Sequence, residues 1–285
     1  TLSSSSAASD VYKRQDSASL VSLAAKEFNY DVTTFSIIDN DKRYNELDNI
    51  ESTVNDIGCK SFKVKLDSNN DNITRLENLV KYHDAPVATI SYFIHSILSE
   101  EIASKGFKIS VSGTGADEIF SGYYDHFNLH LNEIKGDKDF NKYLLDWKTY
   151  THKYVRHPEL RKYDLYFKNP KIRSHIYLNN NYFSDFLKTP FKEEFTEKKY
   201  TPSLLRNRMM NEMFHEVVRV ILHEDDLNSM FYSLENRSPF LDKDLFEFVN
   251  TIPSKYLIKN GYAKNLLRSS MTVSYTHLRA HETRG

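Results

Sequence analysis

The sequence predicts an α/β protein in which a parallel sheet carries helices on both faces, followed by a mainly helical C-terminal part. Between residues 16 and 130, helical and strand-like segments alternate along the chain, and this alternation is typical of parallel sheets. From residue 131 onward the strand patterns stop, and Tyr, Phe, Lys and Asn dominate, with scattered prolines. We therefore divide the chain into an α/β core over residues 16–130 and a helical part over 131–272 that completes the same domain.

The two ends of the chain do not share these patterns. Residues 1–15 begin with a run of Ser and Ala of low complexity, and residues 273–285 break the helical pattern before them. Both segments resemble translated adapter sequence, so we expect them to be foreign or disordered and exclude them from fold prediction, as tags are excluded. The natural protein would then be longer than this chain, and its first strand would lie just before Asp16.

The individual elements follow from hydrophobic periodicity and from turn residues. The segment from residue 45 ends at Gly58, a residue that commonly follows a helix. In the helical part we expect helices over 204–222, 241–251 and 262–271. In the core we expect helices over 17–28, 45–57, 73–83 and 90–104, and strands over 31–38, 59–66 and 107–112.

Composition limits the classes of function. The net charge of −1 gives no basic stripe for nucleic acid, and no apolar run approaches the ~20 residues that span a bilayer. A single cysteine, Cys59, forms no internal disulfide and fits a reducing compartment. We therefore expect a cytoplasmic protein without a nucleic-acid or membrane partner.

Residues 110–124 are the most informative stretch. They are typical of a strand, a glycine-rich turn, and a helix that begins with Asp117 and Glu118. Gly113 and Gly115 allow a sharp turn and a close backbone approach to a ligand, and the N–H groups of such a turn can bind phosphate. Because Mg²⁺ is usually held by one or two carboxylates together with substrate phosphates, this stretch predicts a nucleotide site.

A second acidic helix start lies at Asp16-Ser17. Asp and Ser are favoured at helix N-termini, and the strand over 31–38 follows this helix. In a parallel sheet such starts lie side by side at the carboxyl ends of the strands, where open α/β sheets bind ligands. The two acidic helix starts are therefore predicted to form one site.

Four blocks of the sequence resemble signatures of the asparagine synthetase family, and they occur in the family's order. They are Asp16-Ser17, the tail of the family's pyrophosphate loop; residues 112–123 (SGTGADEIFSGY); residues 224–242; and residues 262–268. The resemblance covers roughly residues 16–271.

This resemblance implies a glutamine-hydrolysing, ATP-dependent amidotransferase with an adenine nucleotide alpha hydrolase-like fold of the ATP-pyrophosphatase type. The family's synthetase domain adenylates a carboxylate, releases pyrophosphate, and lets ammonia displace AMP. ATP and Mg²⁺ are the implied cofactors, and aspartate is the default acceptor. Ammonia would come from a glutaminase domain missing from this chain. A second copy of the chain, in a homodimer, is a further candidate partner.

The resemblance also assigns roles to residues. Asp16 and Asp117 match the magnesium-binding acids, and Lys264 matches a lysine that stabilises charge on the pyrophosphate side during adenylation. The plainer interpretations are a helix cap, a first-turn charge and a solvated lysine, and Arg268 one helical turn after Lys264 could simply pair with an acid. The implied catalytic residues are Lys264, Asp117 and Arg268; the ATP-binding residues are Asp16, Ser17, Phe35, Ser36, Ile37, Ser112 and Gly113; the substrate-side residues are Thr114 and Glu118.

Two departures from the family pattern leave alternatives open. The loop's Ser-Gly-Gly is replaced by Lys13-Arg14-Gln15, so this chain as written should bind ATP poorly. Thr114 stands where asparagine synthetases carry Glu. In this respect the motif resembles relatives that amidate a uronic-acid-type sugar carboxylate in surface polysaccharide pathways. A nucleotide-binding relative without catalysis is the remaining alternative.

Overall fold

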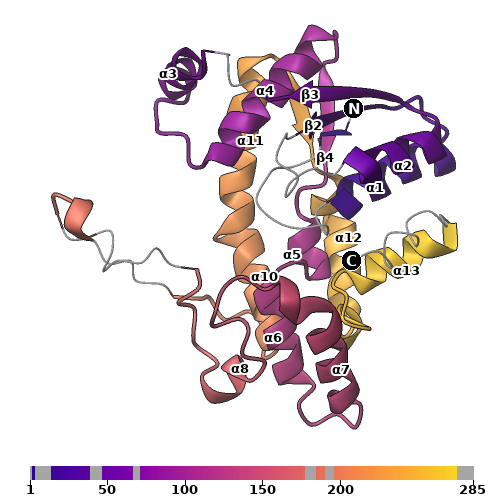
Figure 1. Cartoon of the computed structure of the whole chain (residues 1–285), viewed down its shortest axis with the longest axis vertical. Helices are drawn as coiled ribbons and strands as arrows, with labels where there is room; N and C mark the ends of the chain where they lie inside the picture. The colour runs from indigo at the N-terminus through magenta and orange to yellow at the C-terminus, as the bar shows by residue number, and fades with distance from the viewer. Residues whose placement is uncertain are drawn as a thin grey trace.

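The protein has a mixed α/β fold built on a five-stranded parallel sheet (Figure 1). The computed structural model describes residues 2–3, 14–38, 47–66, 71–176, 184–189 and 196–274. The strand order is β3-β2-β1-β4-β5, so the predicted parallel sheet is confirmed. The strands are β1 (Leu2–Ser3), β2 (Thr33–Ile38), β3 (Lys60–Lys65), β4 (Ile109–Ser112) and β5 (Glu235–Arg237).

The β2–β3 pair carries the aromatic centre of the sheet's core. Phe35 lies opposite Phe62 in the parallel register, and their rings stack with centroids 5.0 Å apart. The edge of Phe107 meets the Phe35 ring at 5.5 Å. Such cross-strand aromatic pairs add to the stabilisation that area burial provides. Four further buried side chains belong to this cluster: Val64, Leu98, Ile102 and Leu234.

Helices cover both faces of the sheet, as predicted. α1 and α2 lie on one side, whereas α3, α4 and α11 lie on the other (Figure 1). α3 begins where the Asp71 carboxylate accepts the Thr74 N–H at 3.0 Å, and α2 ends before Gly58, whose φ is 72°. The covering helices are α1 (Arg14–Ser22), α2 (Leu47–Ile57), α3 (Asn72–His83), α4 (Ile90–Ser104) and α11 (Val217–Phe231).

The helical part packs around a second core beneath the sheet (Figure 1). Trp147, Tyr166 and Leu205 are among its buried side chains. A π-helical turn, Leu23–Glu27, extends α1, and a second, Trp147–Thr151, extends α7. The helices around this core are α6 (Tyr124–Glu133), α7 (Phe140–Asp146), α8 (Leu165–Lys168) and α10 (Leu204–Phe214). A further cluster joins α5 (Ala116–Phe120), α12 (Lys243–Thr251) and α13 (Asn265–Ser274).

Two helix predictions are wrong in detail. The expected helix over 204–222 is two helices, α10 and α11, separated at His215 and Glu216. The Glu216 carboxylate binds the Arg208 guanidinium at 2.8 and 2.6 Å, and the N–H groups of both His215 and Glu216 share the Asn211 carbonyl. The helix expected over 262–271 begins only at Asn265.

Parts of the end segments expected to be foreign or disordered belong to described elements: residues 2–3 to β1, 14–15 to α1 and 273–274 to α13. Leu2–Ser3, which fall within the excluded residues 1–15, pair with both β2 and β4 at the centre of the sheet. α1 begins at Arg14, so Asp16 lies in its first turn instead of capping it. The rest of residues 1–13, where the first strand was expected, and residues 275–285 lie outside the described residues.

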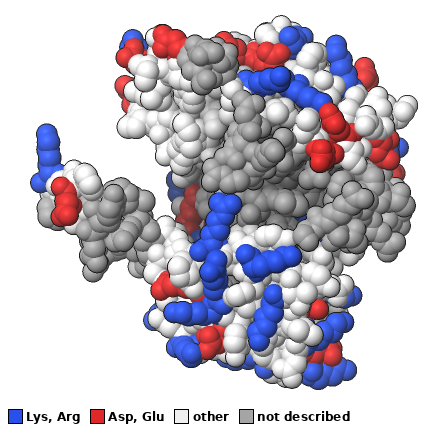
Figure 2. All heavy atoms as spheres, in the orientation of Figure 1, with Lys and Arg blue, Asp and Glu red and all other residues white. Residues whose placement is uncertain are grey.

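The described surface is mixed in charge. Lys and Arg side chains gather over the lower, helical half of the face in Figure 2, and acidic groups are interspersed around its rim. Among the helices that the structure describes, none is long and apolar enough to cross a bilayer.

Candidate functional site

The candidate site lies at the point where the strand order reverses. From β1 the sheet extends to β2 on one side and to β4 on the other, and open α/β sheets bind ligands at such a switch point. Gly113 follows β4 there, and a Cβ on it would lie 2.8 Å from the Asp16 Cβ and 3.1 Å from the Ser17 N. The two predicted helix starts therefore lie side by side, and only glycine permits this approach.

Lys264 joins the two acidic residues. Its Nζ lies 2.6 Å from Oδ2 of Asp16 and 2.7 Å from Oδ1 of Asp117. Lys264 is 1% exposed and Asp16 is 4% exposed, so both are shielded from water, whereas the Asp117 side chain is 17% exposed. Three residues that the sequence places about 100 and 150 positions apart thus meet in one contact.

Lys264 does not lie on a helix, contrary to the prediction that placed it one turn before Arg268 on the same helix face. Its φ of 56° is left-handed, and the Arg268 N–H donates to its carbonyl at 2.9 Å to begin α13. The bend turns the side chain inward. This conformation is strained for a residue with a Cβ, a feature that often accompanies functional sites.

Burial governs the protonation of this cluster. Burial and the neighbouring Asp117 charge raise the pKa of Asp16 to about 7, against the opposing effect of Lys264. Burial alone would lower the pKa of Lys264, but the Asp117 and Asp16 carboxylates raise it above its ordinary value. Lys264 is therefore protonated at neutral pH, and both Asp16 and Asp117 contact its charge. Of these two acids, Asp16 has the raised pKa.

The carboxylates fit a divalent cation. Oδ1 of Asp16 is buried and has no hydrogen-bond partner among the residues that the structure describes, although buried polar groups are normally satisfied. Asp117 supplies a second oxygen within reach of the same lysine nitrogen. Oxygen ligands of this kind suit Mg²⁺, so Asp16 and Asp117 could hold it.

Polar residues, not apolar ones, form the buried side of β4. Ile109 is 42% exposed, whereas Ser110 and Ser112 are 4% and 3% exposed, which reverses what apolar alternation alone would predict. Ser112 Oγ lies 3.1 Å from the hydroxyls of Thr114 and Ser238. This hydrogen-bonded face leads from β4 to the glycine turn, and it accounts for the burial of the serines.

Strand β5 supplies partners that the sequence analysis did not assign. Asn236 accepts a hydrogen bond from Ser110 at 3.0 Å, and Ser238 contacts Ser112. The signal was present in the block over residues 224–242, which was recognised by resemblance but not predicted to contain a strand. A strand of three residues is too short to show a period.

The remaining predicted residues are the β2 segment from Phe35 to Ile37, and Arg268. Phe35 is fully buried in the sheet core, so only its backbone is available to a ligand, and Ser36 and Ile37 continue β2 beside it. The Arg268 guanidinium donates to the Ala263 carbonyl at 2.9 Å and lies over the Tyr262 ring, and its charge lowers the pKa of Asp16.

Glu118 is buried behind Asp117. It accepts a hydrogen bond from the Tyr123 hydroxyl, and burial together with the Asp117 charge raises its pKa to about 7. Its hydroxyl partner is thus a half-buried tyrosine that precedes α6, which favours a structural role for this acid.

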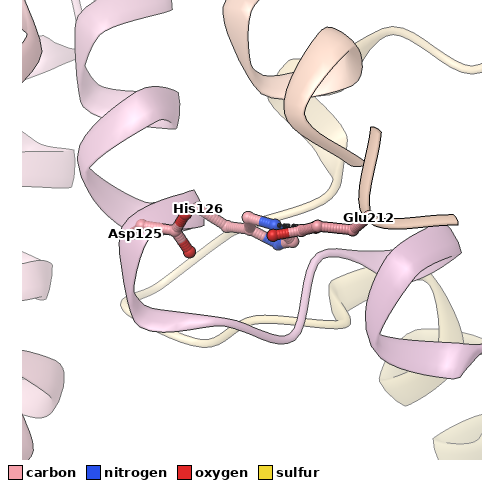
Figure 3. Close-up of side chains that lie close together, drawn as sticks. All are labelled: Asp125, His126 and Glu212. Carbon is pink, nitrogen blue, oxygen red and sulfur yellow. Dashed lines mark hydrogen bonds and ion pairs between the residues drawn. The ribbon is translucent and has the colours of Figure 1, made fainter. Parts of the chain in front are cut away.

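A second buried cluster contains Asp125, His126 and Glu212 (Figure 3), whose ligand atoms lie within 4.8 Å of one another. His126 Nε2 lies 2.7 Å from Oε2 of Glu212, and Arg208 Nε lies 3.0 Å from Oε1 of Glu212 and 3.5 Å from Asp125. Burial by itself would raise the pKa of the Asp125 carboxyl. The neighbouring His126, His175 and Arg208 side chains outweigh burial and hold this pKa well below its ordinary value. Arg208 thus lies against both carboxylates, and the cluster is part of an ionic network in the helical part.

The chain belongs to the asparagine synthase family, whose sequence profile matches residues 16–274. It is 30% identical over 272 residues to asparagine synthetase [glutamine-hydrolyzing] 1 of Bacillus subtilis (strain 168). That match covers 90% of this chain but only 42% of the Bacillus protein. The chain therefore corresponds to less than half of that relative, and the resemblance predicted from the four sequence blocks is confirmed.

Proposed function

We propose that this chain is the synthetase part of an ATP-dependent amide-forming ligase, with aspartate as the default acceptor. The observation that carries the proposal is the contact of Lys264 with both Asp16 and Asp117 at the switch point of the sheet. The family membership supports it, and so does the relative's name, which is that of a glutamine-hydrolysing synthetase.

The reaction joins two groups that repel each other. The acceptor carboxylate attacks the α-phosphorus of ATP, pyrophosphate leaves, and ammonia then displaces AMP from the acyl-adenylate. Charge develops on the departing pyrophosphate, and fixed cations and N–H donors stabilise such charge. In the proposal Lys264 supplies the fixed cation, and the backbone of the turn at Gly113 supplies a close approach to phosphate.

A divalent cation bound at Asp16 and Asp117 would neutralise phosphate charge and orient the leaving group. Arg268 lies at the start of α13 with its charge near Asp16, where it would add positive charge to the phosphate side. Ser17, Ser112 and Gly113 would line the nucleotide, and the β2 backbone at Phe35 to Ile37 would contact the base.

Thr114 bears on the acceptor. It is 7% exposed, and its hydroxyl accepts a hydrogen bond from Ser112. A hydroxyl cannot act as the carboxylate base that glutamate provides at this position, so a uronic-acid-type sugar carboxylate is the second candidate acceptor. A nucleotide-binding protein without catalysis is the third candidate, supported by Lys13-Arg14-Gln15 in place of Ser-Gly-Gly.

ATP–pyrophosphate exchange tests the proposal in a variant that restores the loop, Lys13→Ser with Arg14→Gly and Gln15→Gly. We expect exchange that depends on one acid from a panel of aspartate and uronic acids. Asp117→Ala should abolish it, whereas Glu247→Gln, an exposed change on α12, should not. If ATP binds but no acid supports exchange, the acceptor lies outside the panel. If ATP does not bind, the enzyme proposal fails, and the chain is a scaffold that keeps only the fold.

A further inference from the structure

The Asp117 carboxylate packs directly against the turn that follows α5. A Cβ on Gly122 would lie 1.6 Å from Oδ1 of Asp117 and 2.5 Å from its Cγ. The Gly122 N–H donates to the Asp117 carbonyl at 2.9 Å. The carboxylate thus fills the space that a side chain at position 122 would take, and its orientation depends on where this turn lies.

The turn is held from its C-terminal side by Tyr123. Ser121 adopts a left-handed φ of 71°, so the turn is strained and needs outside support. The Tyr123 hydroxyl donates to Oε1 of Glu118, and the Tyr123 N–H donates to Nδ1 of His126 at 3.4 Å. The ring edges of Tyr123 and His126 meet with centroids 5.2 Å apart.

His126 in turn is fixed by α10. It is fully buried, and its Nε2 lies 2.7 Å from Oε2 of Glu212 (Figure 3). The Tyr123 N–H faces Nδ1, so in the neutral ring the proton lies on Nε2, which donates to Glu212. Arg208 donates to the other oxygen of Glu212 at 3.0 Å, so neither the carboxylate nor the ring can rotate freely.

We propose that His126, anchored by Glu212, is a positioning residue for Asp117. The connection runs from Glu212 through His126 and Tyr123 to the turn at Gly122, and so to the Asp117 carboxylate. The ionic network of the helical part thereby sets the geometry of a carboxylate in the α/β core. This inference rests on the function proposed for Asp117, whereas the contacts themselves do not depend on it.

The first test measures Mn²⁺ binding to the chain as it stands, from the electron paramagnetic resonance signal of free Mn²⁺. Tyr123→Phe removes the hydroxyl that binds Glu118, and His126→Leu removes both ring nitrogens. We expect each to weaken Mn²⁺ binding about tenfold, as loss of an outer-shell partner does. His126→Gln can still donate to Glu212 and should stay within about twofold of the unsubstituted chain.

Tyr166→Phe is the matched control. Tyr166 is fully buried, and its hydroxyl has no hydrogen-bond partner within the described part of the chain, so its removal should leave Mn²⁺ binding unchanged. Equal binding in Tyr123→Phe and the unsubstituted chain would overturn the inference. A similar loss in Tyr166→Phe, or no recovery in His126→Gln, would also overturn it, because the effect would then be general loosening.

A double-mutant cycle gives a second readout that needs no metal. Tyr123→Phe is combined with Asp117→Asn, and the urea midpoints of the four proteins are compared. We expect the double variant to deviate from the sum of the single shifts, whereas Tyr166→Phe combined with Asp117→Asn should be additive. If the unsubstituted chain binds no Mn²⁺, the metal assignment of the proposed function fails and this cycle decides: coupling supports the positioning role, and additivity refutes it.

Discussion

The ammonium nitrogen of Lys264 lies 2.7 Å from Oδ1 of Asp117, although 146 residues separate the two in the chain. The same nitrogen contacts Asp16 from the opposite end of the sequence. One buried cation therefore holds together the start of α1, the start of α5 and the loop before α13. The contact links the stability of the fold to the proposed chemistry of the site.

Replacing Lys264 should expose this link. Lys264→Met leaves the buried Asp16 and the half-buried Asp117 without their cation, and breaking a buried pair in this way costs about 3 kcal/mol or more. Urea unfolding measures this loss of unfolding free energy. The loss should be smaller at pH 5 than at pH 8, because Asp16, with its pKa of about 7, takes up a proton at the lower pH. Mg²⁺ should restore part of the stability. Lys243→Met, at an exposed pair with Glu247, should change little, and an equal loss in both variants would contradict the buried-pair account.

Gly122 should tolerate no side chain. Gly122→Ala places a methyl group 1.6 Å from Oδ1 of Asp117, so the carboxylate must move, at a stability cost of roughly 1–3 kcal/mol. In the loop-restored protein we expect ATP–pyrophosphate exchange to be lost. Gly136→Ala is the control, because a Cβ there meets no atom within 4 Å. Retention of full exchange in Gly122→Ala would show that Asp117 does not depend on this contact.

The stability of the fold should depend on the protonation of Glu118. Burial and Asp117 raise its pKa in the folded protein to about 7 from an ordinary 4.5. The folded protein then holds a proton that the unfolded chain has released, so the free energy of unfolding decreases as pH rises from 4.5 to 7. The stabilisation is complete below this window and is roughly 3 kcal/mol at most. Unfolding of Glu118→Gln measured across pH 4 to 8 should show a flatter profile, and an unchanged slope would assign the dependence to other groups.

Phe35 should matter for stability more than for nucleotide binding. Its ring is fully buried against Phe62 and Phe107, so Phe35→Ala should destabilise the fold by about 3–5 kcal/mol. Phe35→Leu keeps an apolar side chain there and should leave the KM for ATP in the loop-restored protein unchanged, because only the backbone can reach a ligand. A raised KM with unchanged stability would place the ring in the nucleotide site.

Much of the α/β core could be predicted from sequence because its signals are local. The helices over 73–83 and 90–104 match α3 and α4 almost to the residue, since periodicity and turn residues determine helix ends. Strand β5 has only three residues, and at the break between α10 and α11 Glu216 pairs with Arg208, eight positions earlier in the chain. Neither feature leaves a periodic signal.

The sequence by itself determined the family, the parallel sheet and the acidic helix starts at Asp16 and Asp117. Each of these depends on short-range patterns of backbone preference and side-chain type, which a chain carries before it folds. Only the tertiary structure decided that Lys264 lies in a left-handed bend between both acids, that Phe35 faces the core, and that His126 binds Glu212. The physical reason is that burial and Coulomb attraction act between groups distant in sequence, and their partners are settled only when the elements pack.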